Sequence, residues 1–133
     1  MKVYESKYSR IIYSQDTLTL EWIWASDNEQ IKPADLKNEV KKFIKIIHTN
    51  ICNKILLDTW YFCFCLDLEI QDWIQMRFDQ TIQQSALQKI AVVKSREVLS
   101  QICIEQLLYE QFPDFVEKKF FYNSFEAREW LKK

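Results

Sequence analysis

The sequence predicts an α/β fold, with one domain over residues 1–133 built on a mixed, mostly parallel sheet of five strands and four helices. Two observations lead to this prediction. The N-terminal segment alternates apolar and polar residues as an antiparallel hairpin does, and the rest of the chain alternates short apolar runs with longer amphipathic segments. Strands that alternate with helices imply right-handed crossovers between parallel strands. A chain of 133 residues is long enough to bury a core of its own.

The first two strands form the predicted hairpin. Residues 8–14 and 17–25 read as strands, and the two residues between them, Gln15 and Asp16, are enough for a tight turn. The second strand places four apolar side chains on one face: Leu18, Leu20, Trp22 and Trp24. We therefore expect this face to pack against the core.

An amphipathic helix is predicted over residues 33–49, with Pro33 in its first turn. Its apolar stripe consists of Leu36, Val40, Phe43, Ile44 and Ile47. The other face carries four lysines, Lys37, Lys41, Lys42 and Lys45. Such a cluster suits an acidic partner, although a solvated face is the simpler interpretation. His48, the only histidine, falls in the last turn, where a cation favours the helix dipole.

The rest of the chain repeats the alternation of strand and helix three times, which completes the order ββαβαβαβα. The predicted elements are a strand at 54–60, a helix at 68–85, a strand at 89–95, a helix at 96–111, a strand at 119–123 and a last helix through Leu131. Asp67 suits the N-cap of the second helix, and Asn123 with Glu126 forms a capping box for the last one. The third helix has its predicted apolar stripe at Leu99, Ile102, Cys103 and Leu107.

Composition and charge argue against several classes of function. The chain has 18 Lys and Arg against 19 Asp and Glu, and so lacks the basic footprint of a nucleic-acid-binding protein. No window of about 18 uncharged apolar residues exists, which predicts no membrane span. The first ten residues lack the apolar segment of a signal peptide, so we expect a cytoplasmic protein. Glycine is absent, and dinucleotide fingerprints, phosphate-binding loops and nucleophile elbows all need it.

The four cysteines are Cys52, Cys63, Cys65 and Cys103. In a chain without an export signal, free thiols are more common than disulfides. Cys63 and Cys65 are separated by one residue, whereas zinc-binding pairs are usually separated by two to four. We therefore expect thiols that pack as small apolar side chains, with no metal or other cofactor. A thiol redox or metal module that uses Cys63 and Cys65 is the alternative.

Candidate binding residues cluster where the predicted parallel strands end. Ligands of open α/β sheets sit beyond the carboxyl ends of the strands. Here those ends supply Asp58, Thr59 and Trp60 from one strand and Lys94 and Ser95 from the next, close to an aromatic connection that contains Tyr61, Phe62 and Phe64. These three aromatics fall outside the predicted elements, so they form either an exposed binding patch or a cap on the core.

Three segments resemble the STAS superfamily, which includes the anti-sigma-factor antagonists. They are LLD at Leu56–Asp58, IAVV at Ile90–Val93 and FFYNSFEAREWL at Phe120–Leu131. The resemblance implies a STAS-like domain with a regulatory role exerted through a protein partner. Regulatory members of that superfamily carry a phosphorylatable serine in an Asp-Ser-small-Gly turn after the central strand. In this chain Asp58 is followed by Thr59 and Trp60, so that switch is not expected here.

The sequence therefore favours a non-enzymatic, cytoplasmic regulatory or binding domain. We expect it to act through a protein partner, a second copy of the chain in a homodimer, or a small apolar ligand. Acid–base catalysis usually needs two titratable groups within reach of one substrate, and the sequence offers no obvious partner for Asp58. The alternative from another class is a small enzyme with its site at the strand ends, using Asp58, Thr59 and Lys94.

Overall fold

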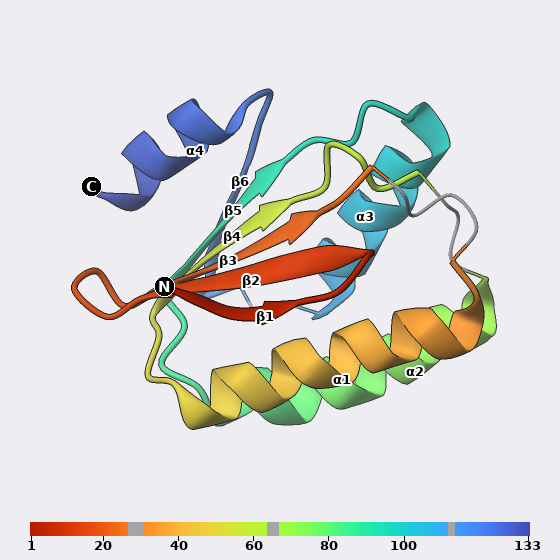
Figure 1. Ribbon diagram of the computed structural model, residues 1–133, viewed down its shortest axis with the longest axis horizontal. Coiled ribbons are helices and arrows are strands. Elements are labelled where there is room, and N and C mark those ends of the chain that lie inside the picture. The colour runs from red at the N-terminus through yellow and green to blue at the C-terminus, as the bar shows by residue number, and fades with distance from the viewer. Residues whose placement is uncertain (27–30, 64–66, 112–113) are drawn as a thin grey trace.

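The computed structural model describes residues 1–26, 31–63, 67–111 and 114–133, and its centre is one six-stranded sheet (Figure 1). In spatial order, which is also sequence order, the strands are β1 (Lys2–Glu5), β2 (Ser9–Ser14), β3 (Thr19–Trp24), β4 (Lys54–Asp58), β5 (Lys89–Val93) and β6 (Glu117–Phe121). The pairs β1–β2 and β2–β3 are antiparallel, and the pairs from β3 to β6 are parallel. The predicted α/β class and mixed, mostly parallel sheet are confirmed.

In the described part of the chain, four helices cover the two faces of this sheet. They are α1 (Pro33–Thr49), α2 (Leu68–Gln83), α3 (Val98–Gln111) and α4 (Ser124–Leu131). Each of the first three joins a parallel strand to the next strand in the same direction, so right-handed crossovers place all three on one face. Helix α4 packs on β4, β5 and β6 from the other face (Figure 1).

The prediction of five strands is wrong by one, because β1 at the edge of the sheet was not foreseen. Its register with β2 shifts between Lys2 and Tyr4, which marks a bulge or a similar irregularity. A strand of four residues with such a shift shows no clear alternation of apolar and polar positions. Local sequence therefore carried too little signal to identify it.

The sheet is apolar on both faces where helices cover it, and successive residues of one strand serve different layers. Ile55 of β4 belongs to the large core under α1, α2 and α3, whereas Leu56 belongs to the smaller core under α4. In β5, Ile90 and Val92 face the first layer, and Ala91 faces the second. This explains why these strands read as continuous apolar runs.

The predicted starts of α1, α2 and α4 are confirmed, and side chains cap the last two, whereas α3 begins at Val98, two residues later than predicted. Pro33 occupies the start of α1. The Ile70 backbone N–H donates to Asp67 Oδ1 at 2.9 Å, and the Glu126 N–H donates to Asn123 Oδ1 at 2.9 Å. Each side chain thus satisfies one of the free N–H groups in the first turn of its helix.

The predicted stripe of α3 is correct at Leu107, which packs against the main core, and wrong at Leu99 and Ile102. Ser100, Ile104 and Leu108 are buried, whereas Leu99 and Ile102 are exposed. Apolar residues occur around most of this helix, so spacing alone could not identify the packed side. Among the described residues, no helix is long and apolar enough to cross a membrane.

The turn between β2 and β3 is longer than predicted. Strand β3 begins at Thr19, and Leu18 has φ 53°, in the left-handed region. Its N–H donates to the Gln15 carbonyl at 3.4 Å, which closes the turn. Leu18 therefore belongs to the turn and not to the core face of the strand.

Candidate functional site

One row of paired residues crosses the sheet on the face that carries α4. The register partners are, in order from β1 to β6, Glu5, Arg10, Ile23, Asp58, Val93 and Phe121. The row lies at the carboxyl ends of the parallel strands, where open α/β sheets bind their ligands. It therefore brings two carboxylates, those of Glu5 and Asp58, and the guanidinium of Arg10 onto one surface from three different strands.

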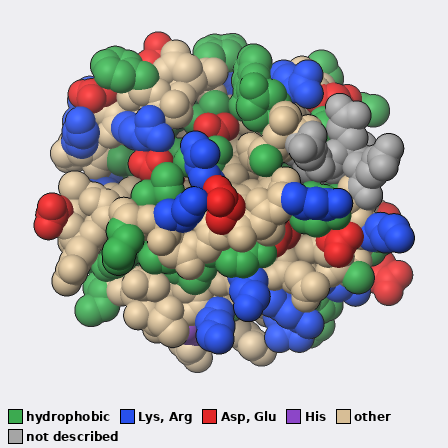
Figure 2. All heavy atoms as spheres, in the orientation of Figure 1, with side chains coloured by type: hydrophobic (Ala, Val, Ile, Leu, Met, Phe, Trp, Pro, Cys, Tyr) green, Lys and Arg blue, Asp and Glu red, His purple; other side chains and the backbone are tan. Residues whose placement is uncertain are grey.

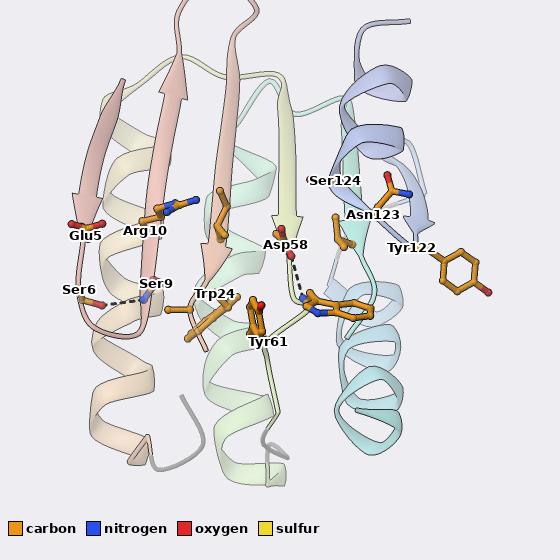
Figure 3. A pocket seen from close by; sticks show the side chains of 14 residues that line it. Glu5, Ser6, Ser9, Arg10, Trp24, Asp58, Tyr61, Tyr122, Asn123 and Ser124 are labelled. Carbon is orange, nitrogen blue, oxygen red and sulfur yellow. Dashed lines mark hydrogen bonds between the residues drawn. The ribbon is translucent and has the colours of Figure 1, made fainter. Parts of the chain in front are cut away.

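Above this row lies a groove of about 600 Å³, bordered by the β1–β2 turn, the ends of β3, β4 and β5, and the start of α4 (Figure 3). Its apolar lining residues are Ile23, Trp24, Ala25, Trp60, Tyr61, Val93 and Tyr122. Its polar lining residues are Glu5, Ser6, Ser9, Arg10, Asp58, Asn123 and Ser124. The volume lies within the range of small-molecule sites, and the lining combines aromatic walls with a few charged groups.

Asp58, the last residue of β4, is half-buried at the floor of this groove. Its Oδ1 accepts a hydrogen bond from the Trp60 N–H at 3.1 Å. Burial raises the pKa of Asp58, although the Trp60 bond and the charges of Arg128 and Arg10 act in the opposite direction. A carboxyl with a raised pKa in a cleft is a candidate for function.

Arg128 of α4, whose charge acts on Asp58, already forms an ion pair. Arg128 donates from Nε and Nη2 to the two carboxylate oxygens of Glu21, at 3.0 and 2.9 Å. This two-point contact joins α4 to β3 and raises the pKa of Arg128. Arg128 therefore reaches Asp58 only through its charge, and the carboxyl of Asp58 remains available to the groove.

A buried carboxylate stabilises the β1–β2 side of the groove through hydrogen bonds. Glu39 of α1 is 2% exposed and accepts hydrogen bonds from the hydroxyls of Tyr4, Ser6 and Ser9. The Trp22 indole N–H then donates to Ser9 Oγ at 2.9 Å. Ser6 and Ser9 line the groove, so this network fixes the β1–β2 turn in place.

The structure divides the predicted aromatic connection. Trp60 and Tyr61, 41% and 42% exposed, line the groove (Tyr61 is labelled in Figure 3). Phe62 is buried in the main core, with its ring centroid 5.0 Å from that of Trp24 in an edge-to-face contact. Phe64 lies outside the described residues. The connection therefore supplies both of the alternatives that the sequence left open, a surface patch and a cap on the core.

The other predicted site residues stand outside the groove lining. Thr59 is buried, and its Oγ1 donates to the Val93 carbonyl at 2.6 Å. Ser95 Oγ donates to the Phe62 carbonyl at 2.6 Å. Lys94 places its Nζ 5.0 Å from the centroid of the Tyr122 ring. These residues support the walls of the site, whereas Asp58, Trp60 and Tyr61 face it.

The predicted thiol pair cannot be placed as a pair, because Cys65 lies outside the described residues. Cys63 is half-buried, and Cys52 and Cys103 are free thiols. Within the described ranges, no group of three or more His, Cys, Asp or Glu side chains could hold a metal ion. His48 lies near Thr81, with 3.4 Å between Nε2 and Oγ1, at the opposite end of the helix layer from the groove.

The lysines of α1 form a second charged surface, and Figure 2 shows basic side chains over this helix at the lower edge of the molecule. Lys37 and Lys41 place their Nζ atoms 5.5 and 6.0 Å from the ring centroid of Trp73. Arg77 of α2 lies 5.3 Å from the same centroid. This surface belongs to the helical layer, on the face of the sheet opposite to α4.

Comparison with known proteins gives no match: no family model fits the chain, and no curated protein or solved structure is significantly similar to it. The STAS-like interpretation therefore stays a prediction from the order of the elements and the three short sequence segments. The candidate site is inferred from the arrangement of this chain's own residues.

Sequence reasoning missed the part of the site that β1 and β2 contribute. Arg10 and Glu5 enter the groove through the register of the sheet, and Glu39 acts from α1 through hydrogen bonds. Arg10 is the one charged residue of β2, and this was the available signal. Asn123, predicted only as the cap of the last helix, and Ser124 beside it also line the groove.

Proposed function

We propose that this chain is a non-enzymatic binding domain whose ligand occupies the groove above Asp58. The single observation that carries the proposal is the composition of that groove, which joins aromatic walls to charged groups at the carboxyl ends of parallel strands. The ligand is a small molecule with an apolar part, or a segment of a partner protein that offers the same chemistry. A regulatory, STAS-like role in the cytoplasm is the wider setting that we propose for this binding.

The placement of the residues favours binding over the enzyme suggested by the sequence. That hypothesis needs Asp58, Thr59 and Lys94 to act on one substrate. The Thr59 hydroxyl is buried and donates to a backbone carbonyl, and Lys94 lies against an aromatic ring. Neither residue lines the groove, so Asp58 is the only one of the three that a bound molecule would contact.

A second candidate, an enzyme that uses Asp58 as an acid or base, has one observation in its favour. Burial raises the pKa of Asp58 inside a cleft, which is a common property of catalytic carboxyls. The two candidates differ in what happens to a bound molecule. An enzyme converts it, whereas a binding domain returns it unchanged when the protein is denatured.

The proposal is tested by a small-molecule fragment screen on the full chain, followed by backbone amide NMR. We expect fragments with an aromatic ring to shift the amide signals of residues around the groove. Ile23→Trp should fill the groove and abolish these shifts, and Ile102→Trp, on the exposed side of α3, is the matched control. Native mass spectrometry of the protein from its own cells shows whether a ligand or partner co-purifies.

Two results would overturn the binding proposal. One is a screen whose hits shift amide signals elsewhere and are unaffected by Ile23→Trp. The other is chemical conversion of a bound molecule that Asp58→Asn abolishes, which would favour the enzyme.

A further inference from the structure

The groove holds two opposite charges that form no ion pair with any described residue. Arg10 of β2 and Asp58 of β4 both pair in register with Ile23 of β3, which lies between them. Neighbouring strands are about 4.8 Å apart, so the two backbones are about 10 Å apart. Within the described part of the chain, neither side chain belongs to any of the ion pairs, which join Lys2 to Glu5, Arg128 to Glu21 and Lys132 to Glu129.

The nearest alternative partners for these two charges are occupied. Glu5, the register neighbour of Arg10, is 2.9 Å from the Lys2 ammonium. Arg128, which acts on Asp58 through its charge, is held by Glu21. Glu5 and Arg128 are thus each held in an ion pair, and among the described charged residues that line the groove, Arg10 and Asp58 are the two that form none.

The surroundings of these charges are apolar and aromatic. Ile23 separates them, and Trp60 and Tyr61 stand next to Asp58 along the chain. Figure 3 shows Arg10 extending from β2 across the sheet toward β3, in the direction of Asp58. Asp58 is half-buried, whereas Arg10 is exposed. A half-buried carboxylate is stabilised best by an opposite charge that also forms hydrogen bonds, and a guanidinium can hold a carboxylate by a two-point contact.

We propose that the groove binds a small zwitterion, an α-amino acid with an aromatic or other large apolar side chain; this inference rests on the binding function proposed above. The ligand ammonium donates to the Asp58 carboxylate, and the ligand carboxylate accepts from the Arg10 guanidinium. The apolar side chain of the ligand packs on Trp60 and Tyr61. A ligand with a single charge would leave one of the two protein charges unpaired in the groove.

The test compares three probes that share a phenyl ring: L-phenylalanine, phenethylamine and 3-phenylpropionate. Their dissociation constants are measured by NMR titration of the full chain. We expect L-phenylalanine to bind at least about tenfold more tightly than either singly charged analogue, because only the zwitterion pairs both charges.

Two variants separate the contributions of the charges. Asp58→Asn should weaken L-phenylalanine about tenfold and leave 3-phenylpropionate nearly unchanged, because the acid probe has no ammonium. Arg10→Gln should weaken L-phenylalanine by a similar factor and leave phenethylamine nearly unchanged. Glu129→Gln and Lys132→Gln, from an exposed ion pair on and just after α4, are the charge-matched controls and should leave all three constants unchanged. Circular dichroism spectra confirm that each variant is folded.

The zwitterion inference is overturned if L-phenylalanine binds no better than its analogues, if none of the probes binds, or if the two variants behave as their controls do. The binding proposal fails independently, when screened fragments do not depend on the groove-filling Ile23→Trp substitution. A groove that binds other fragments and rejects all three probes would keep the first proposal and overturn the second.

Discussion

Ser9 of β2 donates a 2.8 Å hydrogen bond to Glu39 of α1, and both side chains are buried. The bond connects the helical layer to β2, and the same carboxylate also accepts from Ser6 in the β1–β2 turn. Both serines line the groove at the end of the sheet. A buried carboxylate is costly unless several donors satisfy it. In this chain three hydroxyls do so, and the geometry of the groove depends on that network.

Replacement of Glu39 by Gln is expected to lower the free energy of unfolding by about 2 kcal/mol, because hydrogen bonds to a charged acceptor are lost and buried hydroxyls compete for fewer lone pairs. The measurement is chemical denaturation of the purified variant. Asp79→Asn, an exposed carboxylate on α2, is the control and should change stability by less than about 0.5 kcal/mol. Equal effects of the two substitutions would contradict the role assigned to Glu39.

The division of the aromatic connection gives a second prediction. Phe62→Ala should lower the free energy of unfolding by about 3–4 kcal/mol, because it removes a buried ring from the core beside Trp24. Tyr61→Ala should cost about 1 kcal/mol or less, since this ring is partly exposed and contacts Arg96 at the surface. Thermal and chemical denaturation of both variants provide the measurement. A larger loss for Tyr61→Ala would reverse the structural assignment.

Elements with local signals in the sequence could be predicted, whereas features that depend on packing between distant segments could not. The helix α1 was predicted with its observed bounds, because Pro33 and a regular apolar stripe are local signals. The start of α2 was equally local, since Asp67 caps it. Helix α3 has no such contrast between its faces, and only packing against the sheet selects Ile104 and Leu108 for burial.

Only part of the candidate site could be predicted from the sequence, for the same reason. Asp58 was identified because a strand end in an α/β sheet is a position that sequence order reveals. Arg10 was missed, because it meets Asp58 only through the lateral register of β2, β3 and β4. A register of this kind is fixed by the assembled sheet.

The buried thiol of Cys52 gives a prediction about reactivity. Burial raises the pKa of Cys52 to about 11, so the thiolate is scarce at pH 8. Alkylation by iodoacetamide in the folded protein should be slower than for a free thiol by about a hundredfold or more. Peptide mass mapping over time distinguishes Cys52 from the half-buried Cys63 and Cys103. Rapid labelling of Cys52 before the protein unfolds would show that this part of the core opens easily.

The raised pKa of Asp58 predicts how stability depends on pH. Desolvation is the main cause, and the folded-state pKa lies above the value of about 3.9 expected for the unfolded chain. Between these two values the folded protein holds the proton more strongly, so the contribution of Asp58 to stability falls as pH rises through this window. Asp58→Asn removes the cost of the buried charge.

We therefore expect Asp58→Asn to raise the free energy of unfolding, relative to the original chain, by more at pH 7 than at pH 3. Chemical denaturation at both pH values gives the measurement, and Glu129→Gln controls for the loss of one exposed negative charge. If the relative stability of Asp58→Asn were instead greater at pH 3, the carboxylate would be stabilised by its surroundings. The groove would then already supply the cation that we assign to the ligand.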